Sequence, residues 1–248
     1  MRVAVAGATG RIGRLTVAAL ERAGHDAVGL SRALGVDVLT GDGLDKALDG
    51  VAAVVDCTST PAQDRQEVVD FFATGTKNLL AAGQRAGVTH HVLLSIVGLS
   101  EPAKAPHYAG KLAQEAAVEQ GQLPWTIVRA TQFHDFAAMV AGWTERDGTA
   151  LIAPLLVQPI APADVGEVLA ETAVQEPRNA RLDIAGPETQ DLVDMARRTH
   201  AVRGKEVRLV PTWQGPFDVG MAGDVLLPGP DARIMPTTFD AWLAAGAR

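Results

Sequence analysis

The chain has one cysteine, one tyrosine and few aromatic residues, which make up 4% of its 248 positions. The single thiol, Cys57, excludes an internal disulfide framework and is typical of a reducing compartment, so we expect a cytoplasmic protein. No apolar run reaches the length of about 18 residues that suggests a membrane-spanning helix. The net charge is −7, whereas binding to nucleic-acid phosphates needs an excess of basic residues. We therefore expect neither a membrane partner nor a nucleic-acid partner.

Hydrophobic residues are plentiful by contrast, at 47% of the chain, and their even spread favours a folded globule over disorder. The length is close to the size at which a single hydrophobic core begins to divide. We therefore expect one main core over residues 1–132. The mixed segment over residues 133–248 is expected to form a small substrate lobe and to return in part to that core.

Short apolar runs alternate with helical patterns through residues 1–130. This alternation predicts crossover units and a parallel sheet, and the runs lack the polar alternation of strands that face water. The predicted fold class is α/β, a Rossmann-like doubly wound parallel sheet with helices on both faces and a small C-terminal lobe. The expected strands are residues 2–6, 27–30, 36–39, 52–57, 91–97 and 126–129, and the expected helices are residues 11–23, 62–86 and 107–120.

The pattern changes after residue 130. Asp164 followed by Glu167 resembles an acidic capping box, and the residues behind it predict an amphipathic helix with Val165, Val168, Leu169 and Ala173 on its apolar face. Earlier in the chain, only residues 31–35 separate the second and third expected strands. That is too short for a crossover helix, so we expect an open adenine side of any nucleotide pocket. The later elements expected are a strand over 182–185, a helix over 188–200 and a loop-rich stretch over 211–236.

A glycine-rich turn stands directly between the first expected strand and the first expected helix. Its glycines, Gly7, Gly10 and Gly13, allow a tight turn and a close approach of the backbone to a pyrophosphate at a helix start. In this context the spacing predicts a dinucleotide site, and the alternative is a packing turn without a ligand. Further contacts to the dinucleotide are expected from three other residues of the turn, Thr9, Arg11 and Ile12.

The end of the second expected strand indicates which cofactor is preferred. An NAD site usually has a carboxylate there for the ribose 2′-hydroxyl, but this chain has Ser31 and Arg32, and Asp26 lies at the other end of the strand. Arg32 and Arg11 can bind a 2′-phosphate, so NADP(H) is favoured over NAD(H). The alternative is that both arginines are solvated surface residues. The fourth expected strand ends in Cys57, Thr58 and Ser59, whose backbone is expected to flank the ribose and the pyrophosphate.

Candidate catalytic residues follow the fifth expected strand. Ser95, at its end, is expected to point into the cofactor cleft. On the next helix, Lys111 lies four residues after His107 and three after Tyr108, so it shares a helix face with them. A lysine there can hold the nicotinamide ribose and lower the pKa of a neighbouring phenol. The alternative is a surface tyrosine and a solvated lysine that pairs with Glu115.

These motifs, together with the run LPWTIVR at residues 123–129, make the chain resemble an atypical short-chain dehydrogenase/reductase. Within that superfamily it is similar to the NmrA-like, NAD(P)H-binding group, which includes quinone reductases and redox-sensing regulators. In the superfamily the proton donor is a tyrosine four residues before the lysine. Here that position is His107, and Tyr108 comes one residue late. Either His107 replaces the acid, or Tyr108 serves from a rotated position, or no side chain donates the proton.

The resemblance implies that Gln132, Phe133 and Phe136 lie where the nicotinamide and substrate pockets meet, although the two phenylalanines suit core anchors equally well. No metal is expected, because the histidines lack partners at metal-ligand spacing. The leading hypothesis is an NADPH-dependent oxidoreductase, monomeric or homodimeric, that reduces a quinone or small carbonyl acceptor. The second is a non-catalytic NADP(H) sensor that acts on a partner protein. Modification of a sugar or isoprenoid-like substrate is a weaker third.

Overall fold

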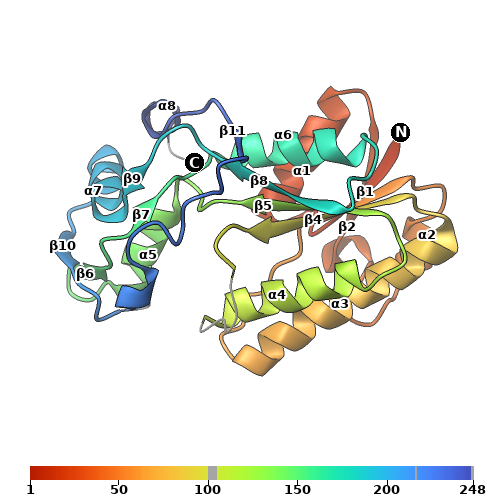
Figure 1. The fold of residues 1–248 in the computed structure, drawn as a ribbon, viewed down its shortest axis with the longest axis horizontal. Helices are drawn as coiled ribbons and strands as arrows, with labels where there is room; N and C mark the ends of the chain where they lie inside the picture. The colour runs from red at the N-terminus through yellow and green to blue at the C-terminus, as the bar shows by residue number, and fades with distance from the viewer. Residues whose placement is uncertain (100–104, 216, 247–248) are drawn as a thin grey trace. The chain divides into compact units, whose positions relative to one another are not determined.

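The computed structural model describes residues 1–99, 105–215 and 217–246 (Figure 1). By its internal contacts the chain forms two compact units. The N-terminal unit comprises Met1–Arg129 and Val165–Leu182, and the C-terminal unit comprises Ala130–Asp164 and Asp183–Arg248. The second segment of the N-terminal unit contributes most of a helix that covers its sheet.

A seven-stranded parallel sheet in the order β11-β8-β5-β4-β3-β1-β2 forms the centre of the fold. Val5 of β1 lies between Gly29 of β2 and Val55 of β3, which fixes the register of the three strands. Four consecutive residues of β1, residues 3–6, are fully buried, as expected for a strand covered on both faces. The Rossmann-like prediction is therefore confirmed. The strands are β1 (Arg2–Ala6), β2 (Asp26–Leu30), β3 (Ala53–Asp56), β4 (His90–Ile96), β5 (Trp125–Ala130), β8 (Ala180–Ala185) and β11 (Arg233–Ile234).

Helices cover both faces of the sheet in the N-terminal unit. Figure 1 shows α3 and α4 on one face and α1 and α6 on the other. Glycines let these helices pack closely: a Cβ atom at Gly110 of α4 would lie 2.4 Å from the Phe72 ring of α3, and one at Gly166 of α6 would lie 2.9 Å from Leu15 of α1. The helices are α1 (Arg11–Arg22), the 3-10 turn η1 (Arg32–Leu34), α2 (Leu44–Ala47), α3 (Arg65–Ala86), α4 (Pro106–Glu119) and α6 (Pro162–Ala173).

The prediction of a strand at residues 36–39 is wrong. That segment is a loop whose backbone closes on itself, because the Asp37 N–H donates to Asp42 O and the Leu39 N–H donates to the Asp37 carboxylate. Its apolar residues pack against helices instead of pairing in the sheet, and Val38 Cγ2 would lie 3.2 Å from a Cβ atom at Gly75 of α3. Apolar spacing alone does not distinguish these two kinds of burial.

The capping box expected at Asp164 is also wrong. Helix α6 begins at Pro162, a residue suited to a first helical turn because it has no N–H to leave unpaired. Asp164 is therefore inside the helix, and its carboxylate accepts bonds from the Thr237 N–H at 3.2 Å and hydroxyl at 2.9 Å. Glu167 pairs with Arg22 of α1 at 2.7 Å. The apolar face of this helix is confirmed, since all four residues expected on it are buried.

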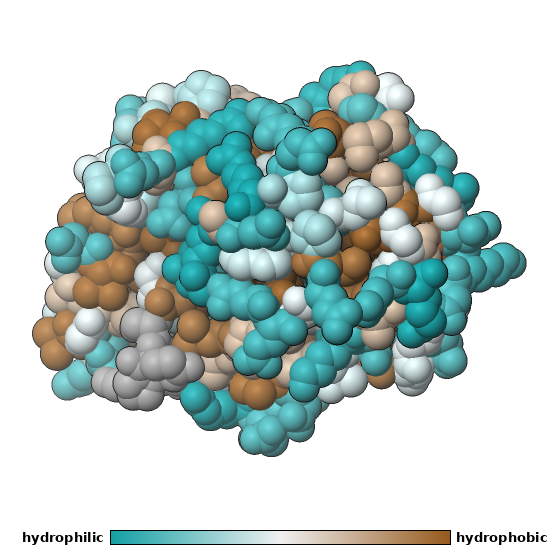
Figure 2. All heavy atoms as spheres, turned by 45° about the vertical axis from the view of Figure 1, so that its right-hand side comes forward, coloured by the Kyte–Doolittle hydropathy of each residue, from teal (hydrophilic) through white to brown (hydrophobic). Residues whose placement is uncertain are grey.

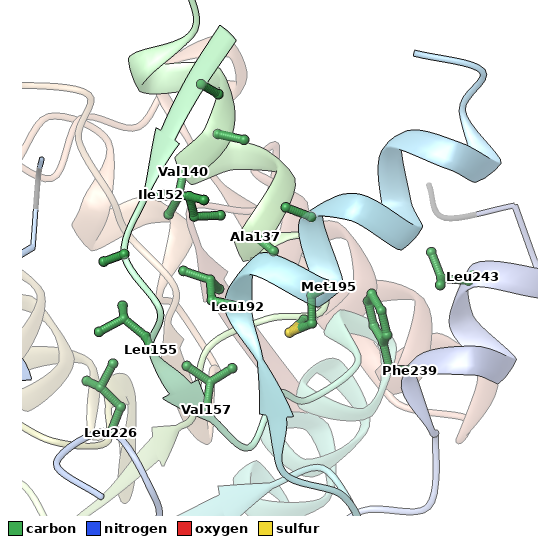
Figure 3. Packing of buried hydrophobic residues seen from close by; sticks show 14 of the residues in the cluster. Ala137, Val140, Ile152, Leu155, Val157, Leu192, Met195, Leu226, Phe239 and Leu243 are labelled. Atoms are coloured by element: carbon green, nitrogen blue, oxygen red, sulfur yellow. The ribbon is translucent and has the colours of Figure 1, made fainter. Parts of the chain in front are cut away.

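The C-terminal unit has its own hydrophobic core. Side chains from α5, β6, α7 and α8 converge there, among them Val140, Ile152, Met195 and Phe239 (Figure 3). The helix expected at residues 188–200 begins later, because the Asp191 carboxylate accepts from the Asp194 N–H and caps α7. The elements are α5 (Phe136–Thr144), β6 (Thr149–Ile152), β7 (Leu156–Val157), β9 (Gln190–Asp191), α7 (Leu192–Val202), β10 (Arg208–Pro211), the 3-10 turn η2 (Val219–Met221) and α8 (Phe239–Ala244).

The surface is mixed in character. On the face drawn in Figure 2, hydrophilic residues cover most of the area and hydrophobic residues gather in patches, most densely at the left. Exposed large apolar side chains include Met139 and Trp143 of α5. Among the described residues, no helix combines the length and the apolar character that crossing a bilayer requires.

Candidate cofactor site

The glycine-rich turn connects β1 to α1 with a geometry that only glycine permits. Gly7 has φ +77°, and its N–H donates to Leu30 O of β2 at 3.0 Å. The Gly10 N–H then donates to Gly7 O at 2.8 Å and closes the turn. A Cβ atom on Gly13 would lie 2.1 Å from Gly7 O, so the helix approaches the turn more closely than any other residue would allow.

Helix α1 presents its N-terminus to this turn without a side-chain cap. Its N-cap is Gly10, which has no side chain to cap it, and its first turn contains no acidic residue. The first N–H groups of a helix have no partner within the helix, and the macrodipole adds a partial positive charge there. The arrangement therefore favours an anion at the turn, as a dinucleotide pyrophosphate requires.

The strand order places the turn at the switch point of the sheet. The chain passes from β1 outward to β2 and then to β3 on the other side of β1. In open α/β sheets, ligands bind at the carboxyl ends of the strands beside such a switch point, here β1 and β3. The turn and the end of β3 lie close together there, because a Cβ atom on Gly7 would be 2.8 Å from Cys57 O. The residues present thus fit a dinucleotide.

The end of β2 has the polar groups expected for the adenine ribose. The Ser31 hydroxyl oxygen is buried and has no hydrogen-bond partner among the described residues. Arg32 is exposed at the start of η1, whereas Arg11 is the half-buried first residue of α1 and interacts with neighbouring groups. A buried hydroxyl without a partner is unusual in a folded protein and suggests a ligand or a water at this position.

The residues that follow β3 differ in character. Burial and the neighbouring Asp56 raise the pKa of the Cys57 thiol to about 12, so the thiol stays protonated at neutral pH and is a poor nucleophile. Thr58 is fixed to Asp56, whose Oδ1 accepts from its N–H at 2.9 Å and from its hydroxyl at 2.6 Å. Ser59 is exposed.

Lys111 lies in a buried polar network that the sequence did not reveal. Its ammonium group donates to Leu94 O of β4 and to Gln114 Oε1, both at 2.8 Å. The Gln114 amide in turn donates to Asp56 Oδ2 at 2.9 Å and to the Thr76 hydroxyl at 3.1 Å. Lys111 is only 4% exposed, so the alternative of a solvated lysine is wrong.

Burial shifts the proton affinities on this helix. It lowers the pKa of Lys111 to about 8, although Asp56 opposes the change. Burial and the nearby Lys111 charge lower the pKa of His107 to about 4. The two side chains also share a neighbour. The centroid of the Phe72 ring lies 4.6 Å from the Lys111 ammonium nitrogen and 5.4 Å from the centroid of the His107 ring. His107 is therefore neutral at pH 7, while Tyr108 is half-buried beside it.

Glu115 has hydrogen-bond partners that the sequence did not reveal. Its carboxylate is 2% exposed and accepts from Arg129 of β5 at 2.8 Å and 2.6 Å, from Arg181 of β8 at 3.1 Å and from the Ser95 hydroxyl at 2.5 Å. Burial raises the pKa of this carboxyl, but the bonds from Arg129 and Ser95 outweigh it and bring the pKa below its usual value. Ser95 is therefore engaged by Glu115.

The residues predicted for the substrate pocket belong to the C-terminal unit. Within the described part of the chain, both amide atoms of Gln132 are buried without a hydrogen-bond partner. The same holds for the hydroxyl of its neighbour Thr131, which the sequence did not single out. Phe133 pairs its backbone with Ile160 as an isolated bridge. The Phe136 ring packs against two rings that the sequence also did not single out. The distances between ring centroids are 6.3 Å to Trp143 and 5.9 Å to Phe217.

Neither the cavity in the C-terminal unit nor the buried histidines belong to this constellation. A cavity of about 480 Å³ has none of the predicted site residues in its lining, which comprises Gly148, Arg197, His200, Ala201, Lys205, Glu206, Val207 and Arg208. In β4, His90 bonds the Thr126 hydroxyl at 2.9 Å, and both ring nitrogens of His91 are buried without a partner in the part of the chain that the structure describes. Burial lowers the pKa of both rings, so both are neutral core residues.

Comparison with known proteins places the chain in a family. A family model described as NAD(P)H-binding matches residues 7–176. The Photosystem II assembly factor Ycf39 of Synechocystis sp. is 31% identical over 147 residues, which are 54% of this chain and 45% of that protein. The match thus spans less than half the length of that relative.

Two solved structures share the fold. A short-chain dehydrogenase/reductase superfamily protein from Agrobacterium tumefaciens with bound NAD has a TM-score of 0.71 and 19% identity, over 100% of this chain and 96% of that one. The NADPH-dependent quinone oxidoreductase of Escherichia coli, complexed with NADPH, has a TM-score of 0.66 and 19% identity, over 85% of this chain and 78% of that one. Because the family model matches well over half of the residues, beginning at the glycine-rich turn, this chain belongs to the NAD(P)H-binding family, as its NmrA-like resemblance implied.

Proposed function

We propose that the chain is an NADPH-dependent oxidoreductase that reduces a quinone or another small carbonyl acceptor by hydride transfer. The observation that carries the proposal is the backbone cradle at the carboxyl ends of β1 and β3. There Gly7 and Gly13 leave no room for a Cβ atom, beside a helix start without a side-chain cap. Support comes from the family, which binds NAD(P)H, and from a structural neighbour described as an NADPH-dependent quinone oxidoreductase.

The preference for NADPH is attributed to the end of β2. Arg32 offers a guanidinium group without an ion pair among the described residues, and Ser31 offers a buried hydroxyl without a partner. A 2′-phosphate satisfies both groups, and a 2′-hydroxyl carries no charge for the guanidinium to pair with. Arg11, at the start of α1, is the second cation proposed for this phosphate.

Each residue of α4 has a distinct proposed role. NADPH supplies the hydride when it is bound. The ammonium of Lys111 has three N–H donors, of which Leu94 O and Gln114 Oε1 take two, and the third is assigned to the nicotinamide ribose. His107 is neutral at pH 7 because of its low pKa and is not assigned as the acid. Tyr108 is assigned as the proton donor for aldehydes, and a reduced quinone takes its proton from water.

The acceptor is proposed to contact the segment after β5. Gln132 offers an amide whose oxygen and nitrogen are both buried without partners, which suits recognition of an oxygen-bearing acceptor. Phe133 and Phe136 are proposed to contact the ring of an aromatic acceptor. The predicted acceptor is accordingly a small planar molecule with polar oxygens.

The test is NADPH oxidation by the purified protein across a panel of quinones and aldehydes, compared between wild type and Tyr108→Phe. We expect activity with quinones, and a loss of about tenfold or more in Tyr108→Phe with aldehydes only. His107→Asn is the matched control, expected to remain within about threefold of wild type at pH 7, because its ring is already neutral. Protein that binds NADPH but oxidises it with no acceptor of the panel contradicts the proposal.

A non-catalytic sensor of the NADP⁺/NADPH ratio is the second candidate. It is favoured by the displaced tyrosine at position 108 and by the commitment of the Ser95 hydroxyl to Glu115, which leave few proton donors at the site. A relative described as an assembly factor is consistent with action on a partner protein. The discriminating measurement is a pull-down in NADP⁺ and in NADPH, and partner binding that ignores the cofactor state contradicts the sensor.

A further inference from the structure

Glu115 makes a set of contacts that no proposed role accounts for so far. A buried carboxylate loses its hydration, and it is tolerated only when charged partners and hydrogen bonds replace the water. Here two guanidinium groups and one hydroxyl surround it, with Arg129 in a bidentate arrangement. The next acidic residue on the same helix, Glu119, pairs only with Arg181 among these residues and is 32% exposed in its side chain.

The partners of Glu115 come from three neighbouring strands. Ser95 belongs to β4, Arg129 to β5 and Arg181 to β8, and these strands are adjacent in the sheet. The carboxylate therefore attaches α4 to the sheet, and Ser95 and Arg129 lie near the carboxyl ends of their strands. In an open α/β sheet, that is the edge at which ligands bind.

Lys111 is attached to the same strand one helical turn earlier. It bonds the carbonyl of Leu94, while Glu115 accepts from the side chain of Ser95, the next residue of β4. Residues four apart lie on one helix face, so the two contacts act along one line and fix both the rotation and the height of α4. Loss of the Glu115 contacts would free the helix to move and displace the Lys111 ammonium.

The proton of Ser95 is also accounted for. A serine hydroxyl has one hydrogen, and that hydrogen lies in the 2.5 Å contact with Glu115 Oε1, because an ionised carboxylate can only accept. The serine oxygen therefore has only lone pairs to offer to any other group. This arrangement removes Ser95 from the possible proton donors to an acceptor.

We propose that Glu115 is a positioning residue that holds Lys111 in place for cofactor binding and commits the Ser95 proton, so that Ser95 does not protonate the substrate. The inference rests on the proposed function, since it assumes that NADPH binds at Lys111. It extends that function by assigning Glu115 a role that it performs only through Lys111 and Ser95. A structural ion pair without this role would affect unfolding but would not separate cofactor affinity from turnover.

The experiment compares wild type, Ser95→Ala, Glu115→Gln, the double variant and Glu119→Gln. Glu119→Gln is the matched control, because it makes the same change on the same helix and also loses a bond to Arg181. The measurements are the Kd of NADPH from its fluorescence, kcat and KM with a quinone and with an aldehyde, the pH profile of kcat, and unfolding in urea. Far-UV circular dichroism checks that each variant is folded.

We expect the Kd of NADPH to rise about tenfold in Glu115→Gln and less than about twofold in Glu119→Gln, with kcat within about threefold of wild type in both. The double variant should resemble Glu115→Gln, because the Ser95 hydroxyl bonds the same carboxylate and residues in one network are not additive. A fall in kcat of about 100-fold in Ser95→Ala, with Kd unchanged, would mean that Ser95 is the acid and would overturn the proposal. Equal effects of Glu115→Gln and Glu119→Gln on Kd would overturn it as well.

The design separates this proposal from the proposed function. If wild type fails to bind NADPH, the proposed function is wrong, and the urea measurements still decide whether Ser95 and Glu115 are coupled. Additive changes in the free energy of unfolding of the two single variants would then contradict the coupling. If Glu115→Gln does not fold, Ser95→Ala alone decides whether the serine supplies the proton.

Discussion

The two halves of the proposed cofactor site, the glycine-rich turn and helix α4, are built by opposite means. At the turn, the proposed binding resides in the backbone: Gly7, Gly10 and Gly13 contribute by having no side chain, and the helix start contributes its N–H groups. On α4, the proposed function resides in side chains that are buried and held by other elements, as with Lys111 and Glu115. The turn therefore tolerates almost no added atom, while α4 depends on partners far away in the chain.

This difference determines how each half should respond to change. A backbone cradle fails when a Cβ atom enters it, and no neighbouring side chain can compensate. A side-chain network responds by degrees, because each partner removed alters a position or a pKa. The following predictions test that contrast.

The largest effect is expected at the turn, in Gly13→Val. The new Cβ atom would lie 2.1 Å from Gly7 O, so the backbone must shift, and we expect NADPH affinity to fall by about 100-fold or more. The measurement is a titration of NADPH fluorescence with a check of folding by circular dichroism. Gly142→Ala in α5 is the control: apart from its own helix backbone and chain neighbours, no atom of the described residues lies within 4 Å of its Cβ position, and alanine should stabilise the helix by about 0.5–1 kcal/mol. If Gly13→Val binds NADPH as tightly as the wild type, the backbone turn is not more sensitive to substitution than the side chains of α4.

The next effect concerns the pH dependence of stability in Lys111→Met. Burial lowers the pKa of Lys111 from 10.5 to about 8, so between these values the unfolded chain binds more protons at this group than the folded protein. The wild type should therefore gain stability relative to the variant as pH rises through this window, by about 1–3 kcal/mol. Urea unfolding of both proteins near pH 7 and pH 10 measures the difference. A constant difference across the window would show that Lys111 has an ordinary pKa.

A smaller effect is expected at the end of β2. Arg32→Gln removes the exposed guanidinium proposed to bind the 2′-phosphate, so the preference for NADPH over NADH should fall by about tenfold. Thermal stabilisation by NADP⁺, NADPH, NAD⁺ and NADH, measured side by side, checks this, because a bound ligand raises the apparent stability. Arg178→Gln, an exposed arginine outside the proposed site, is the control. Greater stabilisation of the wild type by NAD⁺ would refute the proposed NADP(H) preference.

The smallest effect is expected at Cys57. Its thiol has a pKa raised to about 12 by burial and by Asp56, so little thiolate forms at pH 8. We expect iodoacetamide to label the folded protein at least about 100-fold more slowly than the urea-unfolded chain, with NADPH binding unchanged after the treatment. Mass spectrometry follows the labelling. Rapid labelling of the folded protein would make Cys57 a reactive group of the site.

Much of the fold could be predicted because the pattern is local. The strand at residues 2–6, the long helix α3 and the parallel sheet follow from apolar runs, helical spacing and stop signals. The prediction was wrong at residues 36–39, where Val38 packs on α3 and the loop closes through Asp37. It was also wrong at Asp164, where a proline starts the helix two residues earlier. In both cases the residue types suited the predicted element, but the side chains contact other parts of the protein than the prediction assumed.

The site divides in the same way. The turn was recognised because its requirement is written as glycine at fixed spacing. Glu115 appeared in the sequence only as a possible partner of Lys111, since i,i+4 spacing is the only proximity that the sequence gives. Its actual partners stand 14, 20 and 66 residues away along the chain, at Arg129, Ser95 and Arg181.

By itself, the sequence determined that this chain folds around a parallel sheet and places a glycine-rich turn between its first strand and its first helix. The reason is that both depend on local spacing and on backbone freedom, which residue types express directly. Only the tertiary structure decided which group accepts the Ser95 proton in a hydrogen bond, why burial lowers the pKa of Lys111 and which carboxylate attaches α4 to the sheet. Those properties depend on burial and on charges from distant strands, and no local pattern in the chain records them.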